Sequence, residues 1–520
     1  YDALGRVASR TQTVNANPTS KAFRIDYANG PGRPTGLTYP SGRVVAYGFN
    51  AGGQVTSITV DGVTVLASAE YLPFGAVQKW VWANGQVYER TYDLDGRVDT
   101  LTTGPATGTY GDLSQVFGYD SLNRLISAQL AAGQSQGFAY DANGNRTSAT
   151  INGAATTYTY PTTSHRLTSL SGATTRSFTY DAAGNTASSA GITYVYDGRG
   201  RMKQAGSTTY LVNGQGQRVK KASGAAETYF AYDEAGHLIG EYDGSGSPIE
   251  ETVWLGDIPV AVLKPNSGSF DVFYIWADHL GTPRLITDAA NNSRWEWPNN
   301  DPFGNNAPNE NPGGLGVFAY NLRFPGQYYD VESGLSYNYN RDYDSKLGRY
   351  IQSDPIGLRG GVSTYGYVAQ DPLALIDETG LDAWNRDPGF RWKPGGPHVP
   401  NPASVNPNLW LFTNCVQRCY PDVITITATT NGHSSGAHAA GQAIDFIMPG
   451  GGAGANKALC CALECGAKFV QDEYHYPSRN STGGHIHAQL IPGQGGATGT
   501  GSKPKPTCQS CSTAAGTGVN

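Results

Sequence analysis

The sequence predicts a mainly β protein, in which a long series of stacked β-hairpins is followed by a small α+β domain. Gly (68 residues) and Tyr (32 residues) are abundant while Met occurs twice, a composition that favours short strands and tight turns over helices. A Tyr-Asp phrase also recurs along the middle of the chain. All seven Cys lie between Cys415 and Cys511. The last part of the chain is therefore expected to form a separate unit, because 520 residues are too many for one hydrophobic core.

The repeated phrase reads Tyr-Asp-x-x-Gly/Asn-x-x, and each copy predicts a strand that ends on Tyr, a turn, and a second strand. Asp can bond the turn backbone, and Gly or Asn can adopt positive φ. One hairpin cannot bury a face alone, so the hairpins must stack into a continuous sheet. Its Thr-rich strands predict that both faces of this sheet are wet. The copies are YDLDGRV at Tyr92, YDSLNRL at Tyr119, YDANGNR at Tyr140, YDAAGNT at Tyr180, YDGRGRM at Tyr196, YDEAGHL at Tyr232 and the degenerate YPTTSHRL at Tyr160.

These phrases resemble the YD repeats of RHS-repeat proteins, over roughly residues 1–300. Two further stretches, DHLGTPR at 278–284 and RFPGQYYDVESGLSYNYNRDYDSKLGRYIQSDPIGL at 323–358, resemble the RHS-associated core. The resemblance implies a hollow β-shell over 1–300 that is closed by the core at 301–381 and encloses a variable carboxy-terminal toxin at 382–520. Because the chain opens inside a repeat, with YDALGRV, we expect it to be the carboxy-terminal piece of something longer.

The charge of the chain excludes several classes of partner. A net charge of −6 is small for this length, which argues against a nucleic-acid coat or a polybasic membrane binder. No run of 18 or more apolar residues occurs, so no membrane span is expected. Residues 382–520 hold nine Lys/Arg against seven Asp/Glu, a poor composition for a nuclease, since phosphate binding usually relies on basic residues.

Two aspartates form a candidate self-cleavage pair. Asp354 lies in SDPIGL and Asp377 in IDETGL, and they resemble the two aspartates of the family's DPxG…DPxGL motif. Two close carboxyl groups can share one proton, so that one acts as base and the other as acid. The resemblance implies a cut after Leu381. The second site departs from the motif because Glu378 replaces Pro, which removes a turn-forming residue but leaves the carboxylate. The alternative is that both aspartates only cap turns.

The carboxy-terminal part is predicted to contain three strands and one helix. Alternating residues predict strands over 423–430, 441–448 and 485–491, and a stretch with helical composition and no Pro predicts a helix over 456–473. In the third strand His485 and His487 would share one face with Gln489. The opposite face would pack on the helix.

The same part holds a candidate zinc site. His, Asp and His with an open fourth position make a catalytic Zn²⁺ site, in which the metal lowers the pKa of its bound water. HAAGQAID at 438–445 followed by His-Ile-His at 485–487 resembles the zinc peptidase superfamily of D-alanyl-D-alanine carboxypeptidases, murein endopeptidases and the Hedgehog amino-terminal domain. The resemblance implies His438, Asp445 and His487 as zinc ligands.

The general base of that site is harder to assign. The Glu that precedes the final His pair in the carboxypeptidase branch is replaced by Thr482. The role of the base therefore passes to His485, with Glu473 and Asp472 as reserves. The bland alternative is a set of surface His residues on a Gly-rich loop.

The cysteines leave two readings open. Cys415 with Cys419 and Cys461 with Cys465 have i,i+4 spacing, and Cys508 with Cys511 could pair locally. Disulfides would suit an oxidising destination, whereas a second, structural zinc is the rival.

Taken together, the resemblances imply a secreted toxin that is delivered to a target cell, with the periplasm or cell wall as destination. Its shell would release, by autoproteolysis after Leu381, a zinc-dependent peptidase acting on peptidoglycan peptides. The expected partners are a cognate immunity protein, a secretion apparatus and the peptide substrate, with no nucleic acid. The alternatives are a non-catalytic metal-binding tail on a cell-surface or adhesion protein, and a metal-dependent nuclease toxin.

Overall fold

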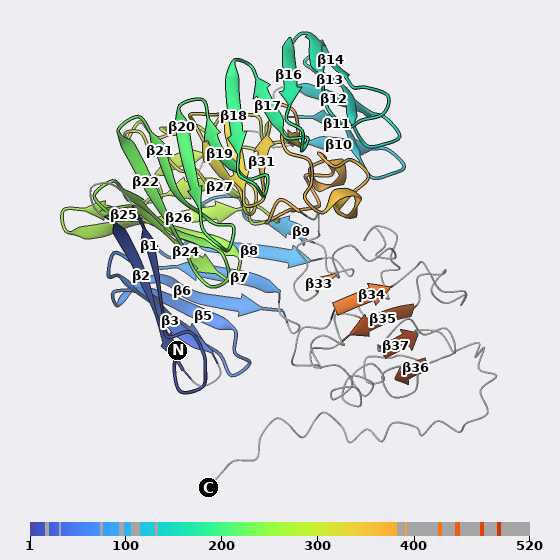
Figure 1. Cartoon of the computed structure of the whole chain (residues 1–520). Helices are drawn as coiled ribbons and strands as arrows, with labels where there is room; N and C mark the ends of the chain where they lie inside the picture. Colours follow the sequence, from blue (N-terminus) through green and yellow to red (C-terminus); the bar gives the residue numbers. More distant parts are fainter. Residues whose placement is uncertain are drawn as a thin grey trace. The chain divides into compact units, whose positions relative to one another are not determined.

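The computed structural model describes residues 1–15, 20–30, 33–72, 76–92, 98–105, 115–130 and 134–381, and five short strands beyond them. The chain divides into two compact units. The first contains strands β1–β32 and continues to Trp384, and the second contains β33–β37. Antiparallel hairpins dominate the first unit (Figure 1).

The first sheet has nine described strands in chain order, each antiparallel to the next. Its strands are β1 (Ser9–Val14), β2 (Lys21–Asn29), β3 (Pro34–Thr38), β4 (Val44–Phe49), β5 (Val55–Val60), β6 (Val63–Tyr71), β7 (Val77–Trp82), β8 (Val87–Tyr92) and β9 (Val98–Leu101).

The second sheet has nineteen described strands, again in chain order and antiparallel throughout. They are β10 (Val116–Tyr119), β11 (Leu125–Gln129), β12 (Ser135–Tyr140), β13 (Arg146–Ile151), β14 (Ala154–Thr159), β15 (Ser169–Gly172), β16 (Arg176–Tyr180), β17 (Thr186–Ser189), β18 (Ile192–Tyr196), β19 (Met202–Ala205), β20 (Thr208–Val212), β21 (Arg218–Ser223), β22 (Ala226–Tyr232), β23 (Leu238–Asp243), β24 (Pro248–Leu255), β25 (Ile258–Asn266), β26 (Ser269–Ala277), β27 (Pro283–Thr287) and β28 (Ser293–Glu296).

The Tyr-Asp phrases lie where the sequence predicts them. Six strands end on the Tyr of a phrase, namely β8, β10, β12, β16, β18 and β22. The turn after Tyr140 shows the construction. Asp141 Oδ1 accepts hydrogen bonds of 2.9 Å from the N–H groups of Asn143 and Asn145, and Gly144 has a φ of 76°. The prediction of hairpins at successive phrases is confirmed in the described residues, and its cause is local: Asp bonds the turn and Gly supplies positive φ.

The tyrosines also join each hairpin to the one before it. The Tyr140 hydroxyl donates to the carbonyl of Leu125 at 2.8 Å, and the Tyr180 hydroxyl donates to Leu167 at 2.9 Å. The Tyr196 hydroxyl donates to Thr186 at 2.7 Å. Each bond crosses a whole hairpin, so the repeated Tyr ties neighbouring repeats together as well as ending a strand.

The expectation that both sheet faces are wet is wrong for β24–β26. Alternate residues of β25 enter two different apolar cores. Leu263 belongs to the core shared with the first sheet, which also holds Trp82, while Val262 belongs to a core shared with Trp295 and Tyr320. The Trp82 indole donates to the carbonyl of Val260 at 2.9 Å. Local composition could not reveal this, because the covering elements come from distant parts of the chain.

The chain after β28 builds the element that carries the site described below. A four-stranded antiparallel sheet is followed by two 3-10 helices, and its side chains are almost all buried. The elements are β29 (Tyr328–Asp330), β30 (Leu335–Asn338), β31 (Arg341–Asp344), β32 (Arg349–Tyr350), η2 (Gly357–Gly360) and η3 (Val368–Gln370).

The second unit contains a five-stranded sheet in the order β33-β34-β35-β37-β36. The strands expected at 423–430, 441–448 and 485–491 are confirmed over their described residues, but the helix expected at 456–473 is wrong over its last four, which form β36. These residues pair with β37, so strand pairing overrides their local composition. The strands are β33 (Arg391–Trp392), β34 (Thr425–Ala428), β35 (Ala443–Ile447), β36 (Phe469–Asp472) and β37 (Ile486–Gln489).

Within the described residues, no helix has the length and apolar character needed to cross a membrane.

Candidate active site

Asp354 and Asp377 meet at one arginine. Arg341, the first residue of β31, places Nη1 2.9 Å from Asp354 Oδ2 and Nη2 3.3 Å from Asp377 Oδ2. All three side chains are about 2% exposed. A buried carboxylate requires a cation or several hydrogen-bond donors, and here one guanidinium serves two carboxylates. The structure therefore brings together the two acids that the sequence singled out.

Leu381, after which the cut is expected, lies against both acids. Its N–H donates to Asp377 Oδ1 at 3.0 Å. A Cβ built on Gly360 would collide with Asp354 Oδ2 and would lie 2.6 Å from the Leu381 carbonyl oxygen. The absence of a side chain at Gly360 therefore lets the Asp354 carboxyl group and the Leu381 carbonyl oxygen approach the same point.

The segment before Leu381 is held by the neighbouring strands. Arg341 Nε donates to the carbonyl of Gly380, and Asn338 Nδ2 donates to the carbonyl of Asp377 at 2.7 Å. Gly380 has a φ of 69°, a conformation that suits glycine, and a Cβ there would collide with the Asn338 carbonyl oxygen. The Gly of the DETG stretch thus lets the chain turn close to the end of β30.

Burial sets the protonation of Asp377. It raises the pKa of this carboxyl group, while the charge of Arg341, the Tyr350 hydroxyl and the N–H groups of Leu381 and Gly380 oppose the rise. The Tyr350 hydroxyl lies 2.7 Å from Asp377 Oδ2. A carboxyl group held between these influences can exchange a proton near the pH of a cell.

The arrangement has the parts needed for peptide hydrolysis. Two carboxyl groups with different environments can divide the roles of acid and base, and a buried cation can stabilise negative charge as it develops. The peptide carbonyl at Leu381 is next to one acid and its N–H is bonded to the other. The catalytic roles of Asp354 and Asp377 stay a prediction.

Sequence reasoning missed three members of this cluster. Arg341, Asn338 and Tyr350 all lie inside the stretch that resembles the RHS-associated core, but nothing in the sequence showed which of its polar residues face the aspartates. Register explains the grouping: Asn338 pairs with Arg341 across β30–β31, and Tyr350 lies on the next strand but one from Asn338.

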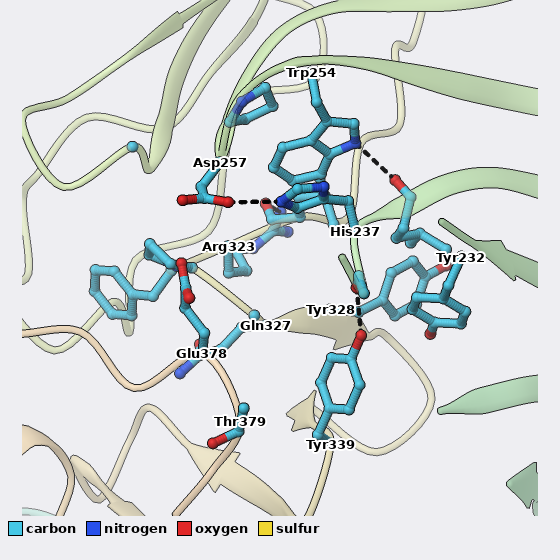
Figure 2. A pocket seen from close by; sticks show the side chains of 18 of the residues that line it. Tyr232, His237, Trp254, Asp257, Arg323, Gln327, Tyr328, Tyr339, Glu378 and Thr379 are labelled. Carbon is cyan, nitrogen blue, oxygen red and sulfur yellow. Dashed lines mark hydrogen bonds and ion pairs between the residues drawn. The ribbon is translucent and has the colours of Figure 1, made fainter. Parts of the chain in front are cut away.

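A cavity of about 210 Å³ lies on the other side of the segment that leads to Leu381. Glu378 and Thr379 line it together with the aromatic rings of Trp254, Tyr328 and Tyr339 (Figure 2). The carbonyl of Glu378 lies where a Cβ on Gly326 would be, so only Gly fits there. The cavity is therefore walled in part by the residue that replaces Pro in the cleavage motif.

His237 lies on the wall of this cavity, at the place in its Tyr-Asp turn that other turns give to Arg or Asn. Its ring nitrogens lie 2.9 Å from Asp233 Oδ2 and 2.9 Å from Asp257 Oδ1, and its ring stacks on Trp254 at 4.6 Å (Figure 2). Burial by itself lowers the pKa of His237, but the hydrogen bonds to Asp233 and Asp257 raise it to about 10. His237 is thus a cation that joins two turns.

The predicted zinc ligands lie in the second unit, and only two are in described strands. Asp445 of β35 and His487 of β37 are direct register partners, and directly paired residues of an antiparallel pair share one face of the sheet. Gln471 of β36 is the partner of His487 on its other side. His438, His485 and Glu473 lie outside the described residues, as do all seven Cys. Asp472 ends β36, opposite Ile486.

Elsewhere, in the side chains that the structure describes, no group of three His, Cys, Asp or Glu is arranged to hold a metal ion. The zinc ligands and the cysteine pairing stay predictions.

Comparison with known proteins identifies the repeats. The family model "Teneurin YD-shell" matches residues 111–250. The toxin protein Tse5 of Pseudomonas aeruginosa is 40% identical over 121 residues, which are 23% of this chain and 9% of Tse5. "Probable deoxyribonuclease RhsB" of Dickeya dadantii is 32% identical over 166 residues, 30% of this chain and 11% of the relative. The chain is an RHS/YD-repeat shell protein.

The relatives of this shell protein carry different printed activities. "Double-stranded DNA deaminase toxin A" of Burkholderia cenocepacia is 34% identical over 145 residues, which are 27% of the chain and 10% of that toxin. The matches to these three toxins span about a tenth of the toxins' length. The crystal structure of TcdB2-TccC3 shares the fold, with a TM-score of 0.55 at 17% identity over 73% of this chain and 24% of that one.

Proposed function

We propose that this RHS shell protein is part of a toxin that cuts its own backbone after Leu381 and so separates residues 382–520 from the shell. The observation that carries the proposal is the convergence of two buried aspartates and Arg341 on the peptide unit of Leu381. Turn capping alone does not need two carboxylates on one buried guanidinium.

In the proposed reaction one carboxylate removes a proton from water, whose oxygen bonds to the Leu381 carbonyl carbon. The bond to the nitrogen of Asp382 then breaks, and that nitrogen receives a proton from the other carboxyl group. The products are a carboxylate on Leu381 and a new amino terminus at Asp382. Arg341 stabilises the negative charge that passes through the site.

The test is cleavage of the full 520-residue chain, followed on a denaturing gel and by sequencing of the new amino terminus. We expect the wild-type chain to be cut before Asp382, and Asp354→Asn and Asp377→Asn to remain intact. Asp344→Asn is the matched control, because Asp344 is equally buried and pairs with Arg176 at 2.7 Å, a different arginine. A chain that is still cut in both aspartate variants would show that these acids are not the catalysts.

For the separated part we propose a zinc-dependent peptidase that acts on peptidoglycan peptides. The paired register of Asp445 and His487 supports it, because one carboxylate and one imidazole on one face suit Zn²⁺. His438 would complete the ligand set, and His485, with Glu473 in reserve, would move the proton. The bound metal would supply a water of lowered pKa and a Lewis acid.

Metal content and activity separate these roles. In the full chain, Asp445→Ala and His487→Ala should lose zinc, as measured by elemental mass spectrometry, together with release of peptides from purified peptidoglycan. His485→Ala should keep zinc and lose activity, since a base is needed for turnover and not for affinity. Retention of zinc in all three ligand variants, His438→Ala included, would remove the zinc assignment.

A nuclease or deaminase is the second candidate, and the printed names of two relatives favour it. Incubating the cleaved chain with duplex DNA and sequencing the product would reveal strand breaks or deaminated bases. In either case we propose that the chain is delivered by a secretion apparatus to a target cell and that a cognate immunity protein protects its producer.

A further inference from the structure

Two residues beside the aspartates have no assigned role in the cut. Asn338 ends β30 and Tyr350 ends β32, and their side chains are fully buried. Asn338 Nδ2 lies 2.7 Å from the Tyr350 hydroxyl and 2.7 Å from the main-chain carbonyl oxygen of Asp377. The Tyr350 hydroxyl in turn lies 2.7 Å from Asp377 Oδ2. Asp377 is therefore held at both its backbone and its carboxyl group by one connected pair.

The direction of each proton in this chain of bonds can be deduced. The Asp377 carbonyl oxygen can only accept, so the side-chain atom of Asn338 that faces it must be the amide nitrogen. That nitrogen also donates to the Tyr350 hydroxyl, whose oxygen is thereby used as an acceptor. The hydroxyl proton is then directed at Asp377 Oδ2. Burial keeps the pKa of Tyr350 well above its usual value, so the hydroxyl remains a donor.

Tyr350 also contacts the third member of the cluster. The Arg341 guanidinium carbon lies 3.8 Å from the centre of the Tyr350 ring, a cation–π contact in a site without water. The ring face fixes the guanidinium that bridges the two acids, while the hydroxyl fixes one of the acids. One side chain thus sets the position of both charges relative to each other.

We propose that Tyr350, oriented by Asn338, is a positioning residue of the self-cleavage site, which holds Asp377 and Arg341 in the arrangement that the cut requires. The inference rests on the proposed self-cleavage. It differs from a packing role in one consequence: the tyrosine acts on the proton equilibrium of Asp377 as well as on its place.

Removal of the hydroxyl predicts a shift in the pH dependence of cleavage. Without this donor the ionised form of Asp377 is less stabilised, so the pKa of its carboxyl group rises. The limb of the pH–rate profile that reports Asp377 must then move to higher pH whether this acid serves as base or as general acid. A hydrogen bond to a charged group corresponds to about one to two pH units.

The experiment uses the full 520-residue chain made by cell-free synthesis with labelled methionine, then moved into buffers across the range of pH. Met202 and Met448 label the fragments on either side of Leu381. The rate of cleavage is compared for wild type, Tyr350→Phe, Asn338→Leu, Asp377→Asn and Tyr343→Phe. Tyr343→Phe is the matched control, since this buried hydroxyl donates to the Phe303 carbonyl at 2.8 Å and makes no hydrogen bond to either acid.

We expect Tyr350→Phe to cleave at least tenfold more slowly at neutral pH, with one limb shifted upward by about one to two pH units. Asn338→Leu should show a smaller shift in the same direction, and Tyr343→Phe should keep the wild-type profile. Thermal melting confirms that each variant is folded. Cleavage of folded Tyr350→Phe at the wild-type rate and pH profile, with Asp377→Asn blocked, would overturn the positioning role alone. Cleavage of Asp377→Asn would overturn the proposed self-cleavage itself.

Discussion

The turns of the shell and the Arg341 site use the same two side chains, an arginine and an aspartate, in different surroundings. In the turn after Tyr119, Arg124 lies 2.7 Å from Asp120 and the two side chains are 15% and 22% exposed. At the site, Arg341 lies 2.9 Å from Asp354 and both side chains are 2% exposed. The geometry of the pairs is similar, so burial, together with the second carboxylate, is what distinguishes them.

Exposure makes the shell pair replaceable. The position that Arg124 occupies in its turn is filled by Asn145 in the next turn and by His237 in a later one, and each bonds the Asp of its own turn. Arg341 has no such freedom, because only a cation can balance two buried carboxylates. The comparison teaches that the repeats use the pair to shape a turn, whereas the core uses it to hold charge away from water.

The largest effect is expected from Arg341→Met. This change leaves Asp354 and Asp377 buried without their cation, which costs about 3–5 kcal/mol of unfolding free energy. Urea denaturation of the Asp382-intact chain, followed by tryptophan fluorescence, measures the loss. A loss below about 1 kcal/mol would place this pair with the surface pairs of the shell and break the comparison.

The same contrast explains what sequence alone could predict. The Tyr-Asp turns were predictable because Asp141 and Gly144 act within one turn. Asp354 and Asp377 were predictable through a resemblance. Arg341 was not, since its function depends on which strand ends face the chain at Leu381.

Two other features were hidden for physical reasons. Residues 469–472 form a strand because they pair with β37, a contact that composition cannot show. His237 could have been noticed as the one His in the turn position otherwise filled by Arg or Asn, but its second carboxylate, Asp257, comes from another turn.

An intermediate effect is expected from His237→Asn, and it should depend on pH. The pKa of His237 is raised to about 10 in the folded chain, from about 6.5 in the unfolded chain. The stabilisation by the charged ring is therefore complete below about pH 6.5 and is lost as pH rises to about 10. Asp257 is 63% exposed, so water screens part of it and we expect a difference of about 2 kcal/mol.

The measurement is the difference in unfolding free energy between wild type and His237→Asn at pH 6 and at pH 10. Asn keeps the bond within the turn that Asn145 makes in its own turn, so the variant isolates the charge. An equal difference at both pH values would mean that the ring is not charged in the folded chain.

The smallest effect is expected from Arg124→Asn. Because the pair with Asp120 is partly exposed and Asn can bond the same carboxylate, we expect a loss of less than about 1 kcal/mol. Raising the salt concentration should reduce even this difference. A loss as large as that of Arg341→Met, measured by the same denaturation, would show that burial is not the decisive variable.

The central claim is that two buried carboxyl groups hydrolyse the peptide bond after Leu381. Synthesis and cleavage of the chain in heavy-oxygen water, followed by mass spectrometry of the fragments, tests it most directly. The account predicts one heavy oxygen in the carboxylate of Leu381, an unlabelled fragment that begins at Asp382, and no cleavage of Asp377→Asn. A cut at another bond, or equal labelling at Leu381 in Asp377→Asn, would contradict it.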